Sequence, residues 1–137
     1  MKAFQVYLNF DGNCREAMTF YQRALDAELE IQSFGDVQME GPPGSENRIM
    51  HARLSKGGNV VMASDTMPGM SFMQGNNFHI NIDCDSTEEL ERYFSALGDG
   101  GKVTMEPQDT FWGARFGMLV DRFGVGWMFN CELNKQG

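Results

Sequence analysis

A chain of 137 residues with 42% hydrophobic and 22% charged side chains has the size and composition of one globular domain, not of a disordered segment. Its formal net charge of −8 opposes binding to the phosphate backbone, so we expect no nucleic-acid partner. Cys14, Cys84 and Cys131 are an odd number without C-x-x-C spacing, which argues against a disulfide framework and against a zinc knuckle. The sequence has neither an apolar run of membrane-spanning length nor a signal-peptide core, so we expect no membrane partner and a cytoplasmic location.

The first half of the chain, about residues 1–66, predicts a strand, a helix and three further strands. Apolar and polar residues alternate from Phe4 to Phe10, which is the period of a half-buried strand. Asn13 is a suitable N-cap for an amphipathic helix, whose apolar stripe runs from Ala17 to Leu25. The remaining strands are expected over residues 28–34, 48–55 and 59–64, with a loop over residues 35–47.

The second half, about residues 77–135, repeats this plan after a linker over residues 67–76. Alternation predicts a strand over residues 78–84, and Ser86 with Glu89 forms the capping box of a second amphipathic helix. Leu90 matches Ala17 of the first helix at an offset of 73 residues. A strand is expected over residues 102–106 and a loop over residues 107–112. Each half is therefore predicted to be a β-α-β-β-β unit, with both units in a single domain of residues 1–137.

The clearest hairpin lies near the end of the chain. Residues 114–120 and 126–131 are predicted strands, joined by a tight turn from Asp121 to Gly124. In the second strand, Trp127 and Phe129 alternate with Met128 and a polar residue. The alternation predicts one apolar face that packs beneath the helices and one mixed face.

Several motifs resemble the vicinal oxygen chelate superfamily, which contains glyoxalase I, extradiol dioxygenases and the bleomycin and fosfomycin resistance proteins. The motifs resemble most narrowly its PhnB-like branch, also named after demethylubiquinone methyltransferase. They are Tyr7-Leu-Asn-Phe-Asp-Gly-Asn13, Glu16-Ala-Met-Thr-Phe-Tyr21, Ile49-Met-His-Ala52, Met62-Ala-Ser-Asp65, Thr110-Phe-Trp-Gly113 and Phe116-Gly-Met-Leu-Val-Asp-Arg-Phe-Gly124. The resemblance implies an α+β fold in which two β-α-β-β-β units form a curved, barrel-like mixed sheet around a pocket. The residues give a methyltransferase almost no support, because nothing here resembles a cofactor-binding Rossmann unit.

The resemblance also implies where a metal would bind. Metal-dependent members supply one ligand from the first strand and one from the last strand of each unit, typically His or Gln and then Glu. The first-strand positions here are Gln5 and His79, and both side chains could ligate. The last-strand positions are Met62 and Met128, whose thioethers cannot replace carboxylates for a hard or borderline divalent cation. The sequence therefore favours no metal and no other cofactor, and a divalent metal held by Gln5 and His79 is the alternative.

Other side chains are candidates for binding a small molecule. His51 is either a general base or hydrogen-bond donor to a ligand, and so the candidate catalytic residue, or a structural histidine bonded to a backbone carbonyl. Trp112 fits a pocket wall and a subunit contact equally well. The residues expected to bind the ligand are Gln5, Tyr7, Met62, Ser64, His79, Asn81, Trp112, Phe116, Met118 and Met128.

The leading hypothesis is a small-molecule binding protein that holds a partly apolar ligand in the barrel pocket. The alternative is a metal-dependent lyase, isomerase or dioxygenase of the glyoxalase type, and the sequence leaves open whether the chain is an enzyme. The edges of two half-barrels invite a partner, so we also expect a homodimer.

Overall fold

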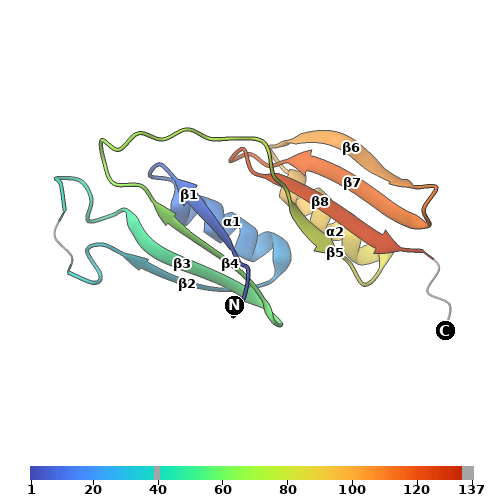
Figure 1. Cartoon of the computed structure of the whole chain (residues 1–137), viewed down its shortest axis with the longest axis horizontal. Helices are drawn as coiled ribbons and strands as arrows, with labels where there is room; N and C mark the ends of the chain where they lie inside the picture. Colours follow the sequence, from blue (N-terminus) through green and yellow to red (C-terminus); the bar gives the residue numbers. More distant parts are fainter. Residues whose placement is uncertain (39–40, 134–137) are drawn as a thin grey trace. The chain divides into compact units, whose positions relative to one another are not determined.

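A computed structural model describes residues 1–38 and 41–133 of the chain (Figure 1). The chain divides into two compact units, Met1–Met73 and Gln74–Gly137, called unit 1 and unit 2 below. Neither helix in the described parts of the chain has the length and apolarity needed to cross a membrane.

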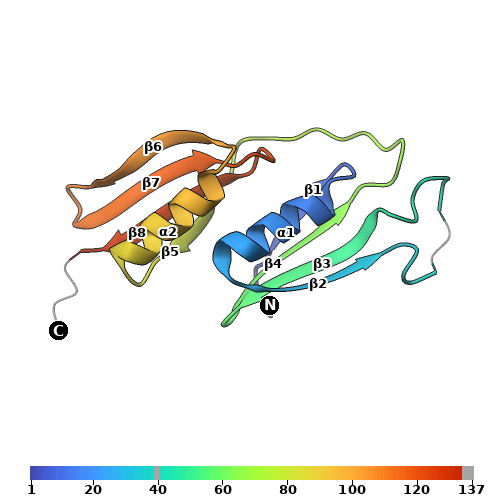
Figure 2. The ribbon, with the colours of Figure 1, turned by 180° about the vertical axis from the view of Figure 1, so that it is seen from behind.

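Unit 1 is a four-stranded mixed sheet with one helix on one of its faces (Figures 1 and 2). Its elements are β1 (Val6–Phe10), α1 (Cys14–Leu25), β2 (Glu28–Ser33), β3 (Ile49–Lys56) and β4 (Asn59–Asp65). The strand order is β1-β4-β3-β2, with β1 parallel to β4 and the other neighbours antiparallel. This is the β-α-β-β-β unit predicted from the sequence.

Unit 2 has the same connectivity. Its elements are β5 (Ile80–Asp83), α2 (Thr87–Gly98), β6 (Lys102–Asp109), β7 (Ala114–Val120) and β8 (Gly126–Glu132), and the strand order is β5-β8-β7-β6. The only parallel pair in this sheet is β5 with β8. The tandem repeat is therefore confirmed, and its sheets are curved and not closed.

Strand alternation decides which side chains enter the core of each unit. In unit 1, Leu8, Ala52 and Ala63 are buried on the face that α1 covers. In unit 2, Trp127 and Phe129 are buried beneath α2, and the Phe129 ring lies 5.3 Å from that of Phe94 in the helix. The predicted packing of the final strand under the helix is confirmed.

The helix start in unit 1 differs from the prediction. Asn13 precedes α1, but its side chain makes no capping hydrogen bond. Instead, the buried carboxylate of Asp65, at the end of β4, accepts hydrogen bonds from the Gly12 and Cys14 N–H groups. A carboxylate at a helix N-terminus satisfies free N–H groups and favours the helix dipole. In unit 2, Ser86 caps α2 as predicted and accepts from the Glu89 N–H.

The strand boundaries differ from the prediction by two residues or more at the end of β6 and at the starts of β1 and β5, and by one residue at several other ends. The predicted loop over residues 107–112 is wrong at its start, because β6 continues through Pro107 to Asp109. A proline is tolerated there because β6 is an edge strand whose pairing is irregular between Met105 and Gln108. The strands β1 and β5 begin two residues later than predicted, since their ladders with β4 and β8 start at Val6 and Ile80.

Candidate functional site

Most of the candidate residues lie on the sheet faces opposite the helices, which we call the open faces. In unit 1, the open face carries Tyr7 and Asn9 of β1, His51 and Arg53 of β3, and Met62 and Ser64 of β4. The predicted ligand residues Tyr7, Met62 and Ser64 therefore share one surface with the candidate catalytic residue His51. Sheet register alone places them together.

Two cross-strand rows organise the open face of unit 1. Tyr7, Met62 and Arg53 are consecutive partners in the first row. Asn9 pairs with Ser64 in the second, which also contains His51. The long Tyr7 side chain crosses between the rows, so that its hydroxyl lies 3.4 Å from Nδ1 of His51, with the ring centroids 6.0 Å apart. A phenol and an imidazole in this arrangement form a polar pair that exchanges one hydrogen bond.

A β-bulge orients the start of β3. Neighbouring residues of β2 pair with His51 and Ile49, so Met50 is an extra residue on β3. By strict alternation, Ile49 and His51 would share a face, but the bulge turns Ile49 into the core, where it is fully buried. The Ile49 N–H donates to the second carboxylate oxygen of Asp65 at 2.8 Å. Through these hydrogen bonds, Asp65 connects β3, the strand that carries His51, to the start of α1.

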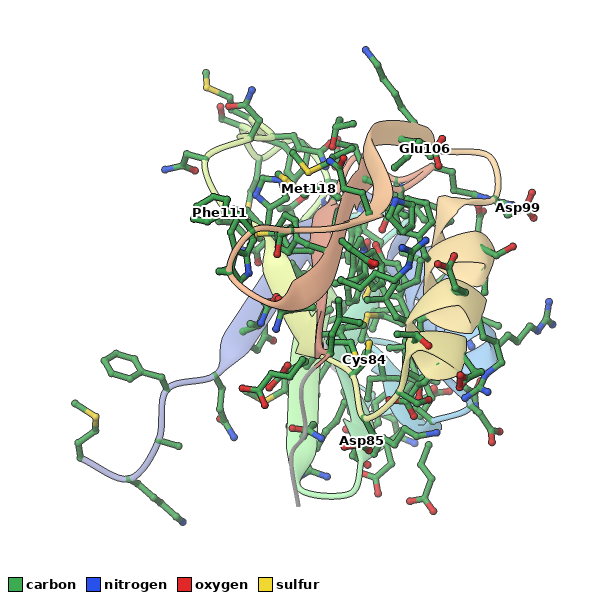
Figure 3. The ribbon with its side chains drawn as sticks, turned by 90° about the vertical axis from the view of Figure 1, so that its right-hand side faces the viewer. Cys84, Asp85, Asp99, Glu106, Phe111 and Met118 are labelled. Carbon is green, nitrogen blue, oxygen red and sulfur yellow. The ribbon has the colours of Figure 1, made fainter. Side chains whose placement is uncertain are left out.

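The open face of unit 2 is more apolar. Met118 of β7 and Met128 of β8 are direct cross-strand partners, and Asn81 of β5 is the neighbour of Met128 on its other side. The ring of Trp112 lies 6.0 Å from that of Phe116, which is on the same face as Met118. We call Trp112, Phe116, Met118 and Met128 the apolar patch. In Figure 3, Phe111 and Met118 lie on the side of this sheet away from α2.

Solvent reaches the apolar patch. Trp112 is 56% exposed, whereas Phe116, Met118 and Met128 are half-buried. Their strand neighbours Leu119 and Phe129, which face α2, are fully buried. An uncovered sheet face that carries two methionines and two large aromatics is typical of a surface for an apolar or planar ligand.

Gln5 and His79 lie outside the strands, one residue before β1 and β5 respectively. Gln5 is exposed, whereas His79 is packed against Gly126, where a Cβ atom would come within 2.8 Å of its ring. Register pairs Met62 with Tyr7 and Met128 with Asn81, not with Gln5 and His79. Nowhere in residues 1–38 and 41–133 do three or more His, Cys, Asp or Glu side chains form a metal-binding group. This donor set, an amide, an imidazole and two thioethers, does not fit a hard or borderline divalent cation.

The cysteines are not placed for nucleophilic chemistry. All three are buried and free. Burial raises the pKa of the Cys14 and Cys84 thiols to about 12. Both therefore carry their protons at neutral pH, and a protonated thiol is a poor nucleophile.

Of the arginines Arg48, Arg53 and Arg115, which lie on or next to the strands β3 and β7, two are engaged away from the open faces. Arg48 bonds to Asp11 and to the Thr66 carbonyl, and Arg115 bridges to Glu91 and Asp109. These two partners raise the pKa of Arg115 still further. Arg53 differs, because it lies on the open face and forms no ion pair within the described part of the chain.

Comparison with known proteins agrees with this architecture. A family model described as 3-demethylubiquinone-9 3-methyltransferase matches residues 2–129. Protein YjdN of Escherichia coli (strain K12) is 39% identical over 136 residues, which cover 90% of this chain and 91% of YjdN. The crystal structure of protein PA1353 from Pseudomonas aeruginosa is 44% identical and superposes with a TM-score of 0.84, covering 95% of this chain and 98% of that one.

Two further structures extend the comparison. A PhnB protein from Bacillus cereus, titled a putative 3-demethylubiquinone-9 3-methyltransferase, is 26% identical with a TM-score of 0.79 over 95% of this chain and 99% of its own. A glyoxalase/bleomycin resistance protein/dioxygenase family enzyme from Burkholderia phytofirmans shares the fold, with a TM-score of 0.66 at 18% identity over 96% of this chain and 100% of its own. The chain therefore belongs to the family described as 3-demethylubiquinone-9 3-methyltransferase, and it shares its fold with the glyoxalase/bleomycin resistance/dioxygenase proteins.

Proposed function

We propose that this chain is a small-molecule binding protein and that the apolar patch of unit 2 holds the apolar part of its ligand. The main observation behind the proposal is the direct pairing of Met118 with Met128 on the face of the sheet opposite α2. Thioether side chains adapt their shape to a bound molecule at little cost. The Trp112 and Phe116 rings beside them suit a planar or aromatic group.

The methyltransferase in the description of the family model is not part of this proposal. A methyltransferase would need a site for its methyl-donating cofactor, whereas each unit here has a single parallel strand pair in a four-stranded sheet. Neither sheet therefore has the successive parallel strands of a doubly wound cofactor-binding fold. The homodimer and the cytoplasmic location remain predictions from the sequence.

Binding of a neutral fluorescent probe tests the proposal. N-phenyl-1-naphthylamine brightens in apolar surroundings, so we expect its fluorescence to rise with wild-type protein and to saturate. Met118→Gln and Met128→Gln should each weaken probe binding about tenfold, since each loses part of the burial free energy of one methionine side chain. Met73→Gln is the matched control, because Met73 is 93% exposed and lies outside the apolar patch. No saturable binding, or equal binding by Met118→Gln and Met73→Gln, would contradict the proposal.

We also propose that the protein works without a resident divalent metal. The reason is the poor donor set, in which Met62 and Met128 occupy the positions where a carboxylate would be needed. Elemental analysis of protein purified without an affinity tag or chelator should find far less than one metal atom per chain. Added Ni, Zn, Mn or Fe(II) should bind wild type and His79→Ala equally weakly. A near-stoichiometric metal that His79→Ala loses would contradict this and favour the glyoxalase-type lyase, isomerase or dioxygenase.

A further inference from the structure

We propose that the open face of unit 1 carries an oxyanion-binding site, in which Arg53, His51 and Tyr7 bind the carboxylate or phosphate group of a small organic acid. Every observation behind this site comes from unit 1, whereas the apolar patch belongs to unit 2. The success or failure of this proposal is therefore independent of the function proposed for unit 2.

Arg53 supplies the charge. Its two cross-strand neighbours are Met62 and Glu30, and no ion pair to Glu30 forms although the two are direct partners. Arg48, Arg115 and Arg122, in contrast, each pair with a carboxylate. In a chain of net charge −8, a guanidinium that stays exposed and unpaired among the described residues is available to an external anion. Its planar fork matches a carboxylate or a phosphate.

His51 supplies a second donor beside the guanidinium. It lies two residues from Arg53 on β3 and on the same face, a spacing of about 7 Å along the strand. The Tyr7 hydroxyl is 3.4 Å from Nδ1 of His51. When the phenol donates to Nδ1, the imidazole proton is held on Nε2, which is then available to donate to a ligand. Tyr7 is in this role a positioning residue.

Charges on the same face decide where the anion lies. The carboxylates, Glu28 and Glu30, belong to β2 at the edge of the sheet. On the other side of Arg53, β4 and β1 present Met62, Ser64 and Tyr7, none of which is a carboxylate. The anion therefore binds over β4, between the guanidinium and the tyrosine–histidine pair, with the Met62 thioether beneath it. That position keeps it away from the glutamates and beside an apolar contact for the rest of the acid.

Nuclear magnetic resonance titration of the full chain tests the site, with benzoate and phenyl phosphate as probes and benzamide as the uncharged analogue. We expect at least one of the two anions to shift the amide signals of Tyr7, His51 and Arg53, and benzamide to bind about tenfold or more weakly than the preferred anion. The anion that binds more tightly identifies the oxyanion class. If neither anion shifts these signals, or if benzamide binds as tightly as the preferred anion, the proposal is wrong.

Variants of the arginine complete the test. Arg53→Gln should weaken binding of the preferred anion about tenfold or more, whereas Arg53→Lys should retain part of the affinity because it keeps the charge without the planar fork. Arg23→Gln is the matched control, because Arg23 is an exposed arginine of the same unit that lies on α1. Thermal melts should be alike for all three, since both arginines are exposed. Equal anion affinity in Arg53→Gln and Arg23→Gln would overturn the proposal.

Discussion

Asp65→Ala is expected to lower the free energy of unfolding by about 3–5 kcal/mol. The substitution removes the acceptor for three N–H groups, those of Gly12, Cys14 and Ile49, at 2.8, 3.0 and 2.8 Å. Leaving a buried donor without a partner costs about 1–3 kcal/mol, and the bonds to Cys14 and Ile49 are buried. Urea unfolding followed by far-ultraviolet circular dichroism measures the loss, because both tryptophans of the chain lie in unit 2.

Asp65→Asn and Asp11→Ala serve as the comparisons. Asp65→Asn should lower the free energy of unfolding by less than Asp65→Ala. Its amide oxygen still accepts from the N–H groups on one side, but its amide nitrogen is a donor that faces an N–H on the other side. Asp11 lies at the same turn, and its bonds to Arg48 and Thr66 lower the pKa of its carboxyl. Because this pKa is lowered in the folded state, Asp11 stabilises the fold above the usual carboxyl pKa, and that effect disappears as pH falls through the lowered value. Because the Asp11 side chain is exposed, Asp11→Ala should lower the free energy of unfolding far less than Asp65→Ala does. If Asp11→Ala and Asp65→Ala lowered the free energy of unfolding equally, the buried hydrogen bonds of Asp65 would contribute no more than the exposed bonds of Asp11.

Asp121→Ala is expected to lower the free energy of unfolding of unit 2 by about 3–4 kcal/mol. Asp121 is 4% exposed, and its carboxylate accepts from the Phe123 and Val125 N–H groups and, at 2.8 Å, from the Trp127 indole. These bonds hold the turn between β7 and β8, and so the register that pairs Met118 with Met128. Trp127 fluorescence in a Trp112→Phe background follows the unfolding of this unit by urea.

A double-mutant cycle isolates the indole bond. Asp121→Asn places an amide where the indole N–H needs an acceptor, and Trp127→Phe removes that N–H. The double variant should therefore be more stable than the sum of the two single losses predicts, as measured by circular dichroism. Asp99→Ala, which removes an exposed partner of Arg122, should leave stability nearly unchanged. Strict additivity of Asp121→Asn and Trp127→Phe would mean that the bond contributes nothing.

Local patterns in the sequence predict most of this fold. Alternation and helical periodicity locate both helices and all eight strands, because each burial pattern repeats within a few residues. The same alternation predicts that Tyr7 and Met62 face away from the helix in unit 1, as Met118 and Met128 do in unit 2. The strand ends were less predictable. The run from Phe4 to Phe10 alternates throughout, yet β1 begins at Val6 because its ladder with β4 starts there.

What the sequence could not predict depends on contacts between distant residues. The Asp65 side chain is 51 residues from the Cys14 N–H that it accepts from, so Asn13 looked like the better cap. The bulge at Met50 changes which face Ile49 occupies, and no local pattern marks it. Arg53 makes no ion pair with the described residues although Glu30 is its direct cross-strand partner, and only the strand register shows that pairing.

The most direct test of the proposed function is a titration of protein labelled with ¹³C at the methionine methyl groups. The chain has eleven methionines, and those among the described residues include members of the core, the linker and the open faces, so each reports on its own surroundings. With N-phenyl-1-naphthylamine added, we predict that the methyl signals of Met118 and Met128 shift and saturate together, while that of the exposed Met73 stays fixed. Unchanged signals from Met118 and Met128 at saturating probe would contradict binding at the apolar patch.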